Sequence, residues 1–258
     1  MDIGECENTP PPSPPTPPSP PYTPPPTPSL AGMVPIVSIP GNWIDQYEAS
    51  VQVLLMMGTW ELHPFNFFVD DLDKYNVTYR AVSPLAYSNS TIMMSVAPQA
   101  YISQAQAEKA CNAAGKSLCS LAQYMASCSV NLSTYPYGNE YRAGFCNEGH
   151  PNPIVTIFGP NATFNFTEMN DPILDTLPNT LVPGGTYANC TNSVTRTFDM
   201  SGNLDEWVSD RTSEGHGIFK GGYFVDASIN GQGCKYETVA HAPTYHDYSL
   251  GFRCCYRS

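Results

Sequence analysis

Residues 9–28, TPPPSPPTPPSPPYTPPPTP, constrain the fold of this chain more than any other stretch, because 13 of these 20 residues are proline. Proline fixes φ and lacks a backbone N–H, so the stretch cannot form a helix interior or a central strand. We expect an extended polyproline II rod that rises about 3.1 Å per residue and reaches about 60 Å. The sequence therefore predicts an extended segment over residues 1–31 and a folded domain over residues 32–258.

The charge balance narrows the classes of partner. The chain has a net charge of −12, and only 13% of its residues are charged. Nucleic acids and anionic membranes need a basic surface, so neither is an expected partner, whereas divalent cations are compatible with this charge. No run of about 18 apolar residues exists, so no membrane-spanning segment is expected.

The cysteines indicate disulfides. The chain has nine cysteines and no C-x-x-C pair of the kind that nucleates zinc sites. Disulfides imply an oxidising compartment, so the protein is expected to be secreted and extracellular, at a cell surface or in a matrix. Met1 to Cys6 shows no signal peptide, so we expect that the chain is a mature form or lacks its leader. Cys6 lies outside the expected domain, at the end of the rod, where it can form an intermolecular bond.

Six N-x-[ST] sequons support secretion, because such sequons accept N-linked glycans in secreted proteins. With so few charges, glycans are expected to supply part of the solubility. The predicted glycosylation sites are Asn76, Asn89, Asn131, Asn161, Asn165 and Asn189.

Local signals predict several helices and strands. Ser103-x-x-Gln106 and Ser120-x-x-Gln123 are capping boxes, each of which opens a helix. We also predict a helix over residues 51–57, capped by Ser50 and ended by Gly58. Residues 59–100 are expected to be irregular. Strands are expected over residues 34–39, 43–47, 154–158, 217–225 and 250–256.

Residues 198–210 combine a polar turn with an aromatic anchor. Asp199 and Asn203 are turn formers, and Glu206 and Trp207 follow at once. Two carboxylates beside several backbone carbonyls form an oxygen-rich set of the kind that Ca²⁺ prefers. The alternative is a solvated turn in which Trp207 fills the core, and spacing alone favours this alternative.

Four stretches, in order, resemble motifs of the formylglycine-generating-enzyme family, also called the sulfatase-modifying-factor family. Together they cover roughly residues 33–258. They are IDQYEAS (44–50), AGKSLCSLAQY (114–124), DMSGNLDEWVSD (199–210), and FKGGYF (219–224) with LGFRC (250–254). The resemblance implies an α+β domain of the C-type-lectin-like kind, loop-rich and disulfide-bonded, preceded here by the polyproline II segment. That fold carries enzymes, metal sites and inert binding modules alike.

The resemblance also implies bonds and ligands. It pairs Cys111 with Cys254 and Cys128 with Cys234, and by elimination Cys119 pairs with Cys255 and Cys146 with Cys190. It implies a structural calcium ion bound by the side chains of Asp199 and Glu206 and the backbone carbonyls of Gly202 and Leu204. A second implied site falls near Asn147 and Glu148, where the following loop departs from the family pattern.

The catalytic residues of the family are missing. Its enzymes use two reactive cysteines, separated by four residues, shortly after the Gly-Gly turn, but residues 223–233 contain no cysteine. Cys234 matches a structural cysteine instead. The iron-dependent sulfoxide-synthase branch takes its iron ligands from a further helical domain that this sequence lacks. His246-Asp247 alone is more typical of a hydrogen-bonded pair than of a metal site. The sequence therefore predicts a protein that is not an enzyme.

Three functions remain open. The first is a secreted structural glycoprotein that joins copies of itself head to tail through the proline-rich segment into an extracellular filament or matrix. The Ser and Thr in that segment resemble extensin-like wall glycoproteins, while the simpler alternative is a semi-rigid linker without a partner. The second is a calcium-dependent carbohydrate- or ligand-binding module on a stalk. The third is a divergent metal-dependent oxidase.

Overall fold

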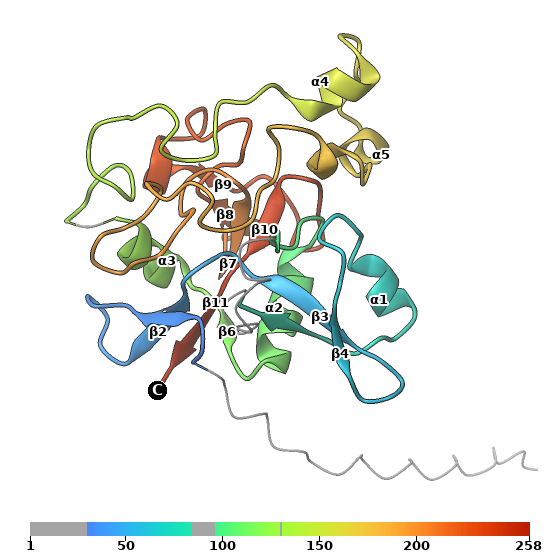
Figure 1. Cartoon of the computed structure of the whole chain (residues 1–258), viewed down its shortest axis with the longest axis horizontal. Coiled ribbons are helices and arrows are strands. Elements are labelled where there is room, and N and C mark those ends of the chain that lie inside the picture. Colours follow the sequence, from blue (N-terminus) through green and yellow to red (C-terminus); the bar gives the residue numbers. More distant parts are fainter. Residues whose placement is uncertain (1–29, 84–95, 130) are drawn as a thin grey trace, which may run out of the picture.

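The computed structural model describes residues 30–83, 96–129 and 131–258 (Figure 1). The predicted rod, Cys6 and Asn89 lie outside these residues. The described residues form an α+β fold in which short elements alternate with long loops. The helices are α1 (Asp70–Lys74), α2 (Gln104–Ala113), α3 (Leu121–Cys128), α4 (Pro153–Phe158) and α5 (Phe166–Met169), with 3₁₀ turns η2 (Leu174–Thr176) and η3 (Gly233–Lys235).

The strands form three small sheets. One has the order β1-β2-β11-β6, one β10-β7-β8-β9, and one β4-β3-β5. Their bounds are β1 (Met33–Pro35), β2 (Asn42–Asp45), β3 (Ser50–Leu54), β4 (Trp60–Leu62), β5 (Tyr79–Val82), β6 (Ser117–Leu118), β7 (Asp205–Arg211), β8 (Gly217–Lys220), β9 (Glu237–Thr238), β10 (Leu250–Phe252) and β11 (Cys254–Arg257).

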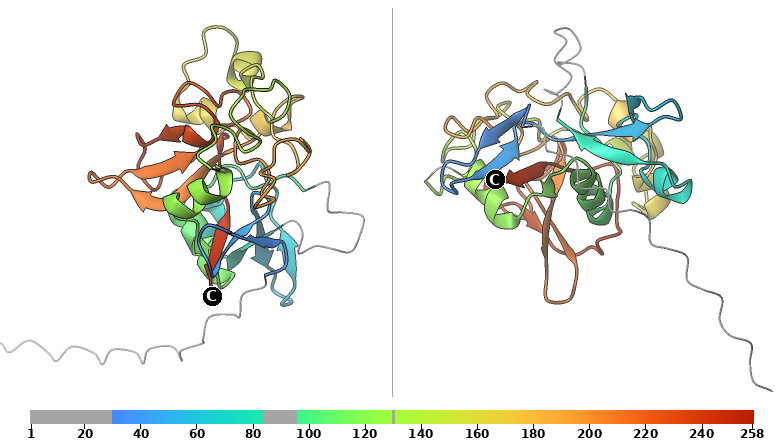
Figure 2. Two further views of the ribbon diagram at one scale, coloured as in Figure 1. Left: turned by 90° about the vertical axis from the view of Figure 1, so that its left-hand side faces the viewer. Right: turned by 90° about the horizontal axis from the view of Figure 1, so that it is seen from below.

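The end of the chain closes the domain. Strand β11 lies between β2 and β6 and is antiparallel to both, so it joins the start of the domain to the segment after α2 (Figure 2). Strand β10 pairs in parallel with β7. Two consecutive short strands thus connect two sheets, and residue 253 lies between them.

The core confirms that Trp207 fills the interior. Its side chain is fully buried, and Nε1 donates a hydrogen bond to the carbonyl of Ile102 at 2.9 Å. The edge of Phe219 packs on it with ring centroids 4.9 Å apart. Because β7 begins two residues before Trp207, this anchor fixes the position of the preceding turn, residues 198–204.

Both helices predicted from capping boxes are confirmed. The hydroxyl of Ser103 accepts from the backbone N–H of Gln106, whose side chain accepts in return from the Ser103 N–H. Ser120 and Gln123 repeat the arrangement at α3. Each box satisfies N–H groups that the first helical turn leaves without partners.

The helix predicted over residues 51–57 is wrong, because strand β3 covers Ser50–Leu54. Val51 and Val53 stand at alternate positions, on either side of Gln52, as in a strand. Both are β-branched, and β-branched side chains favour extended backbone. The strand is also flanked on both sides, by β4 and β5, so its backbone groups pair in two directions. Residues 59–100, expected to be irregular, contain β4, α1 and β5.

The strand predicted over residues 154–158 is wrong, because α4 occupies this position. The side chain of Asn152 accepts from the Ile154 N–H, Pro153 occupies the first helical turn, and Gly159 ends the helix with φ 83°. These end signals outweigh the β-branched residues between them. The strand predicted over 217–225 ends at Lys220, because Gly221 and Gly222 adopt positive φ.

Candidate functional site

The turn 198–204 lies over a buried ion pair. Both carboxylate oxygens of Glu206 accept from Arg253, Oε1 from Nη2 at 2.5 Å and Oε2 from Nε at 2.6 Å, and both side chains are 0% exposed. Arg253 also donates to the carbonyls of Asp45 at 3.2 Å and Phe198 at 3.0 Å. One guanidinium therefore joins β2, the turn and β7.

Two further buried carboxyl groups lie beside this pair. Glu48 accepts from the backbone N–H of Leu204 at 3.0 Å and from the side-chain amide of Asn203. Burial and then the charges of Asp199 and Glu206 raise the pKa of Glu48 well above its ordinary value. Burial raises the pKa of Asp199 to about 7. Three carboxyl groups share one guanidinium, so added positive charge would stabilise this cluster.

Asp199 has one oxygen available for a cation. Its Oδ2 accepts from the Gly185 N–H at 2.6 Å, whereas buried Oδ1 has no hydrogen-bond partner among the described residues. Asp199 adopts a left-handed φ of 56°, as the tight turn requires. A buried carboxylate oxygen without a donor fits a hard cation. Glu206 does not fit, because both its oxygens already accept from Arg253.

The second pair of predicted ligands packs against the same turn. The side-chain amide of Asn147 donates to Thr180 O at 3.0 Å and to Asn203 Oδ1 at 2.9 Å, which fixes its orientation. Oδ1 of Asn147 is left buried without a partner in the described residues, as is Oε1 of Glu148. A Cβ on Gly202 would overlap the carbonyl of Asn147, so only glycine fits there. The amide oxygen of Asn147 thus also fits a cation.

Acidic and histidine clusters of the usual metal-binding kind do not occur here. In residues 30–83, 96–129 and 131–258, no group of three or more His, Cys, Asp or Glu side chains is arranged to hold a metal ion. Asp175 is a buried carboxyl that sequence reasoning missed, and neither of its oxygens has a partner among the described residues. Burial and the charge of Asp247 raise its pKa well above the ordinary value.

A tyrosine-lined groove opens next to Glu148. It has a volume of about 380 Å³ and lies between the loop that holds Tyr135 and Tyr141 and the segment from Val225 to Gln232. Burial and the charge of Glu148 raise the pKa of both tyrosines, so their hydroxyls remain protonated donors at neutral pH. Burial and the charge of Asp226 raise the pKa of Glu148 to about 7. We call this space the tyrosine groove.

The tyrosine groove is lined in part by residues from 223–233, the segment where the family resemblance led us to look for reactive cysteines. Here Asp226, Ala227 and Ser228 take part in the lining. Asp226 accepts from the backbone N–H groups of Ser228 and Ile229, so its carboxylate closes a local turn. The groove therefore offers hydroxyl, amide and carboxyl groups but no thiol among its described lining residues.

The disulfides account for every cysteine among the described residues. The structure joins Cys111 to Cys254, Cys119 to Cys255, Cys128 to Cys234 and Cys146 to Cys190. These are the pairs that the resemblance and elimination gave. All eight cysteines of the described residues are thus oxidised, and a nucleophile requires a reduced thiolate.

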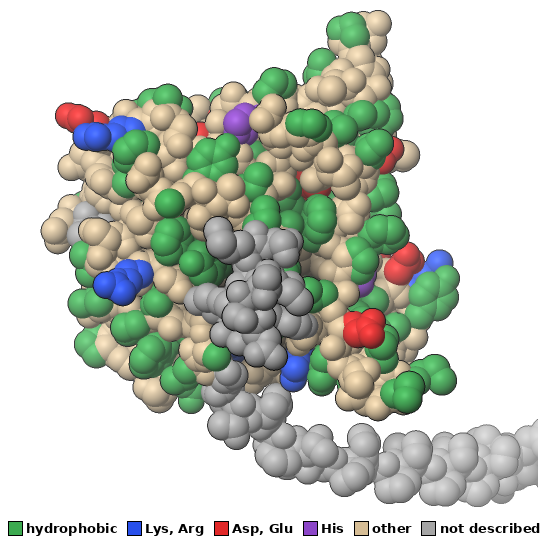
Figure 3. Space-filling view, viewed as in Figure 1, with side chains coloured by type: hydrophobic (Ala, Val, Ile, Leu, Met, Phe, Trp, Pro, Cys, Tyr) green, Lys and Arg blue, Asp and Glu red, His purple; other side chains and the backbone are tan. Residues whose placement is uncertain are grey.

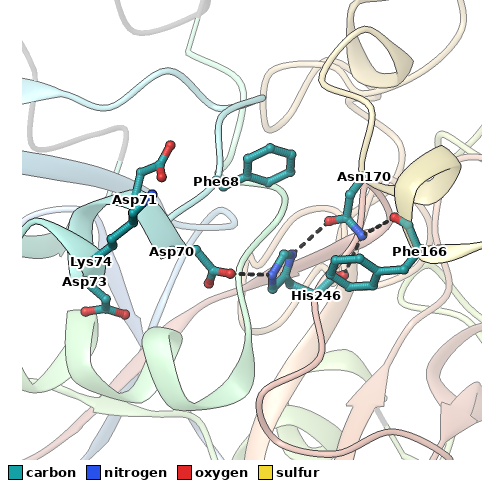
Figure 4. A pocket seen from close by; sticks show the side chains of 8 residues that line it. All are labelled: Phe68, Asp70, Asp71, Asp73, Lys74, Phe166, Asn170 and His246. Atoms are coloured by element: carbon teal, nitrogen blue, oxygen red, sulfur yellow. Dashed lines mark hydrogen bonds and ion pairs between the residues drawn. The ribbon is translucent and has the colours of Figure 1, made fainter.

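His246 lies at a second pocket, of about 500 Å³, between α1 and α5 (Figure 4). Its Nδ1 is 2.8 Å from Asn170 Oδ1, and its Nε2 is 2.9 Å from Asp70 Oδ2. The amide nitrogen of Asn170 donates to two carbonyls, so its oxygen faces the ring. Both ring nitrogens therefore face side-chain oxygens, so His246 is held by hydrogen bonds to Asn170 and Asp70.

The surface agrees with the expected solvent exposure of the sequons. All predicted glycosylation sites within the described residues are exposed, namely Asn76, Asn131, Asn161, Asn165 and Asn189. Charged side chains are sparse among apolar and uncharged ones on the face seen in Figure 3. In the described part of the chain, no helix has the length and apolar character needed to cross a bilayer.

Comparisons with known proteins agree with the fold. The sequence profile of the sulfatase-modifying factor enzyme 1-like domain matches residues 39–258. The chain is also similar to a solved structure titled "Crystal Structure of CarF", with 21% sequence identity and a TM-score of 0.36. That similarity covers 55% of this chain and 47% of the other, so it spans about half of the solved chain. No curated protein matches.

Proposed function

Because the chain belongs to the family of the sulfatase-modifying factor enzyme 1-like domain, we propose that it is a non-catalytic, secreted structural glycoprotein built on an enzyme fold. The observation that carries this proposal is the tyrosine groove, which lies where the enzymes hold their reactive cysteines but has no thiol among its described lining. A binding groove without a nucleophile can retain a ligand that it does not alter.

The proposed occupant of the groove is the proline-rich segment of a neighbouring copy. Polyproline II ligands bind by packing proline rings on aromatic side chains while their carbonyls accept hydrogen bonds. Tyr141 is 55% exposed at the groove and offers both a ring face and a hydroxyl donor. Residues 9–28 carry no charge, so they bring no ionic group into the groove. Head-to-tail binding of this type does not close and builds a filament.

A synthetic peptide of residues 9–28 is expected to bind a chain that begins at residue 30. Replacing Tyr141 with serine should weaken binding by about tenfold or more, the change that about 1.4 kcal/mol gives, because it removes a ring and a donor. Isothermal titration calorimetry measures both affinities.

The matched control for the peptide experiment is Tyr75→Ser. Tyr75 is 68% exposed and lies at the end of α1, outside the described lining of the tyrosine groove. This substitution should leave peptide affinity unchanged. Equal losses in both variants, or no binding by the unmodified domain, would contradict the proposed occupant.

A structural calcium ion is part of the same proposal. The oxygens that support it are Oδ1 of Asp199 at the first predicted site and Oδ1 of Asn147 at the second, each buried and without a partner in the described residues. Such an ion would offset the excess of carboxyl groups beside Arg253 and hold loops that bury little apolar surface.

In a chelator, stability is expected to fall as the pH rises from about 4 to about 7. The raised pKa of Asp199 means that the folded state keeps a proton that the unfolded chain loses near its ordinary pKa, and raising pH removes this advantage. Glu48 contributes in the same direction. Calcium should flatten the dependence by replacing the proton at Asp199. Melting temperature measured against pH, with calcium or EDTA, tests this.

Asp199→Asn provides the control for the calcium experiment. The amide keeps the shape of the side chain but neither titrates nor carries charge, so the pH dependence should become shallower and the response to calcium should shrink. Identical melting curves with calcium and with EDTA in the unmodified protein would remove calcium from the proposal.

A further inference from the structure

A third cavity, of about 510 Å³, is lined by Tyr137 and lies next to the tyrosine groove. Tyr135, which lines the tyrosine groove, stacks on Tyr137, which lines this cavity, with ring centroids 5.3 Å apart and an interplanar angle of 7°. The ring of Phe145 meets that of Tyr137 edge to face at 5.0 Å, so the two rings form an aromatic corner. We call this space the sequon cavity, because Asn131 and Asn189 line it.

The chemistry of the sequon cavity is that of a neutral carbohydrate site. Its polar lining consists of asparagine, serine and threonine side chains, and none of its described lining residues is charged. Amides and hydroxyls can both donate and accept, as the hydroxyls of a sugar require. One face of Tyr137 stacks on Tyr135, and the guanidinium of Arg142 lies 5.6 Å from the ring centroid of Phe145. The aromatic surface that Tyr137 and Phe145 leave at the cavity can cover the apolar C–H face of a pyranose. Phosphates and metal ions would need charged partners that this lining does not supply.

Two glycosylation sequons open onto this cavity from separate loops. Asn131 follows α3, and Asn189 precedes Cys190. Both side chains are exposed, and among the described residues no hydrogen bond engages either amide nitrogen, so each can carry a glycan. The disulfides Cys128–Cys234 and Cys146–Cys190 lie close to the two sequons and restrain the loops that carry them. The cavity therefore does not need a bound sugar to form.

We propose that the sequon cavity seats the inner sugars of the protein's own N-linked glycans, carried at Asn131 and Asn189. The inference rests on the glycosylated, extracellular state proposed above. A sugar bound there bridges the loop after α3 and the loop before Cys190, and it covers the apolar faces of Tyr137 and Phe145. The glycan then acts as a structural element of the domain rather than as a solvated appendage.

The test is the rate at which an N-glycosidase removes each glycan from the native glycoprotein, followed site by site with mass spectrometry. Glycans at Asn131 and Asn189 should leave at least about tenfold more slowly than the glycan at Asn76, because the sugar must first leave the cavity. After denaturation, all three should leave at equal rates.

Substitutions then assign the protection to the aromatic corner. Tyr137→Ser together with Phe145→Ser should accelerate release at Asn131 and Asn189 in a variant whose melting temperature shows that it is folded. Tyr75→Ser, beside Asn76, should change no rate. The comparison between sites in the unmodified protein remains decisive if the double variant does not fold.

Three results would overturn the inference. Equal native rates at all sites, or bare Asn131 and Asn189 beside a glycosylated Asn76, would refute the seated glycan and leave the proposed structural role intact. Absence of glycans at every site would refute both. If the two sites are bare and an added N-acetylhexosamine disaccharide binds the Asn131→Gln, Asn189→Gln protein, the cavity belongs to a sugar from another molecule.

Discussion

Replacing Glu206 with alanine is expected to lower the free energy of unfolding by about 3–5 kcal/mol, because it leaves the guanidinium of Arg253 buried without the carboxylate that accepts two of its hydrogen bonds. Both side chains are fully buried, and two hydrogen bonds of 2.5 and 2.6 Å join them. Water cannot reach Arg253 to replace the lost partner. Urea denaturation at fixed pH, with and without a chelator, measures the loss.

The chelator separates two roles for Glu206. If its carboxylate acts through Arg253, the loss is the same with calcium and without it. If its carboxylate instead holds calcium, the loss should nearly vanish when calcium is absent. A loss below about 1 kcal/mol in both conditions would contradict the buried ion pair.

An exposed ion pair and a double variant serve as controls. Glu108 lies 4.0 Å from Arg211 with half of its side chain exposed, so Glu108→Ala should change stability by less than about 0.5 kcal/mol. Combining Glu206→Leu with Arg253→Met should cost less than the sum of the single substitutions, because neither member of this pair is left buried without the other. The carbonyls of Asp45 and Phe198 still lose a donor in the double variant, so some loss is expected.

The parts of the fold that were predicted correctly have either strong local sequence signals, such as capping boxes, or motifs shared with a family. The capping boxes at Ser103 and Ser120 determine helix starts through groups three residues apart. The order of four motifs indicated the fold as a whole. At residues 51–57 the local signals, Ser50 and Gly58, pointed to a helix, and the pairing of β3 with β4 and β5 outweighed them.

The candidate site was harder to predict because its contacts join distant residues. Glu206 and Arg253 are 47 positions apart, and Glu48 meets Leu204 across 156 positions. One signal was present: Arg253 stands inside an apolar strand pattern, LGFRCCY, where a charged residue is seldom buried unless it is paired. The tyrosine groove had no such sequence signal, since its lining comes from two loops, residues 135–149 and 225–232, that are far apart in the chain.

Removing residues 1–29 is expected to convert the protein from filaments to separate monomers, which is the second large effect that we predict. The described contacts of the domain begin at residue 30, so the shortened chain keeps every disulfide and sheet found in the structure. What it loses is the proposed occupant of the tyrosine groove in the next copy, together with Cys6. Without that ligand, head-to-tail growth cannot continue. The Tyr141→Ser protein keeps Cys6 and so separates the two contributions.

Electron microscopy of the purified native glycoprotein beside the version that lacks residues 1–29 tests the account most directly. The account predicts regular filaments from the full chain and separate particles from the shortened chain. The Tyr141→Ser protein should form fewer or shorter filaments. Separate particles from both chains, or equal filaments from both, would contradict assembly through the proline-rich segment.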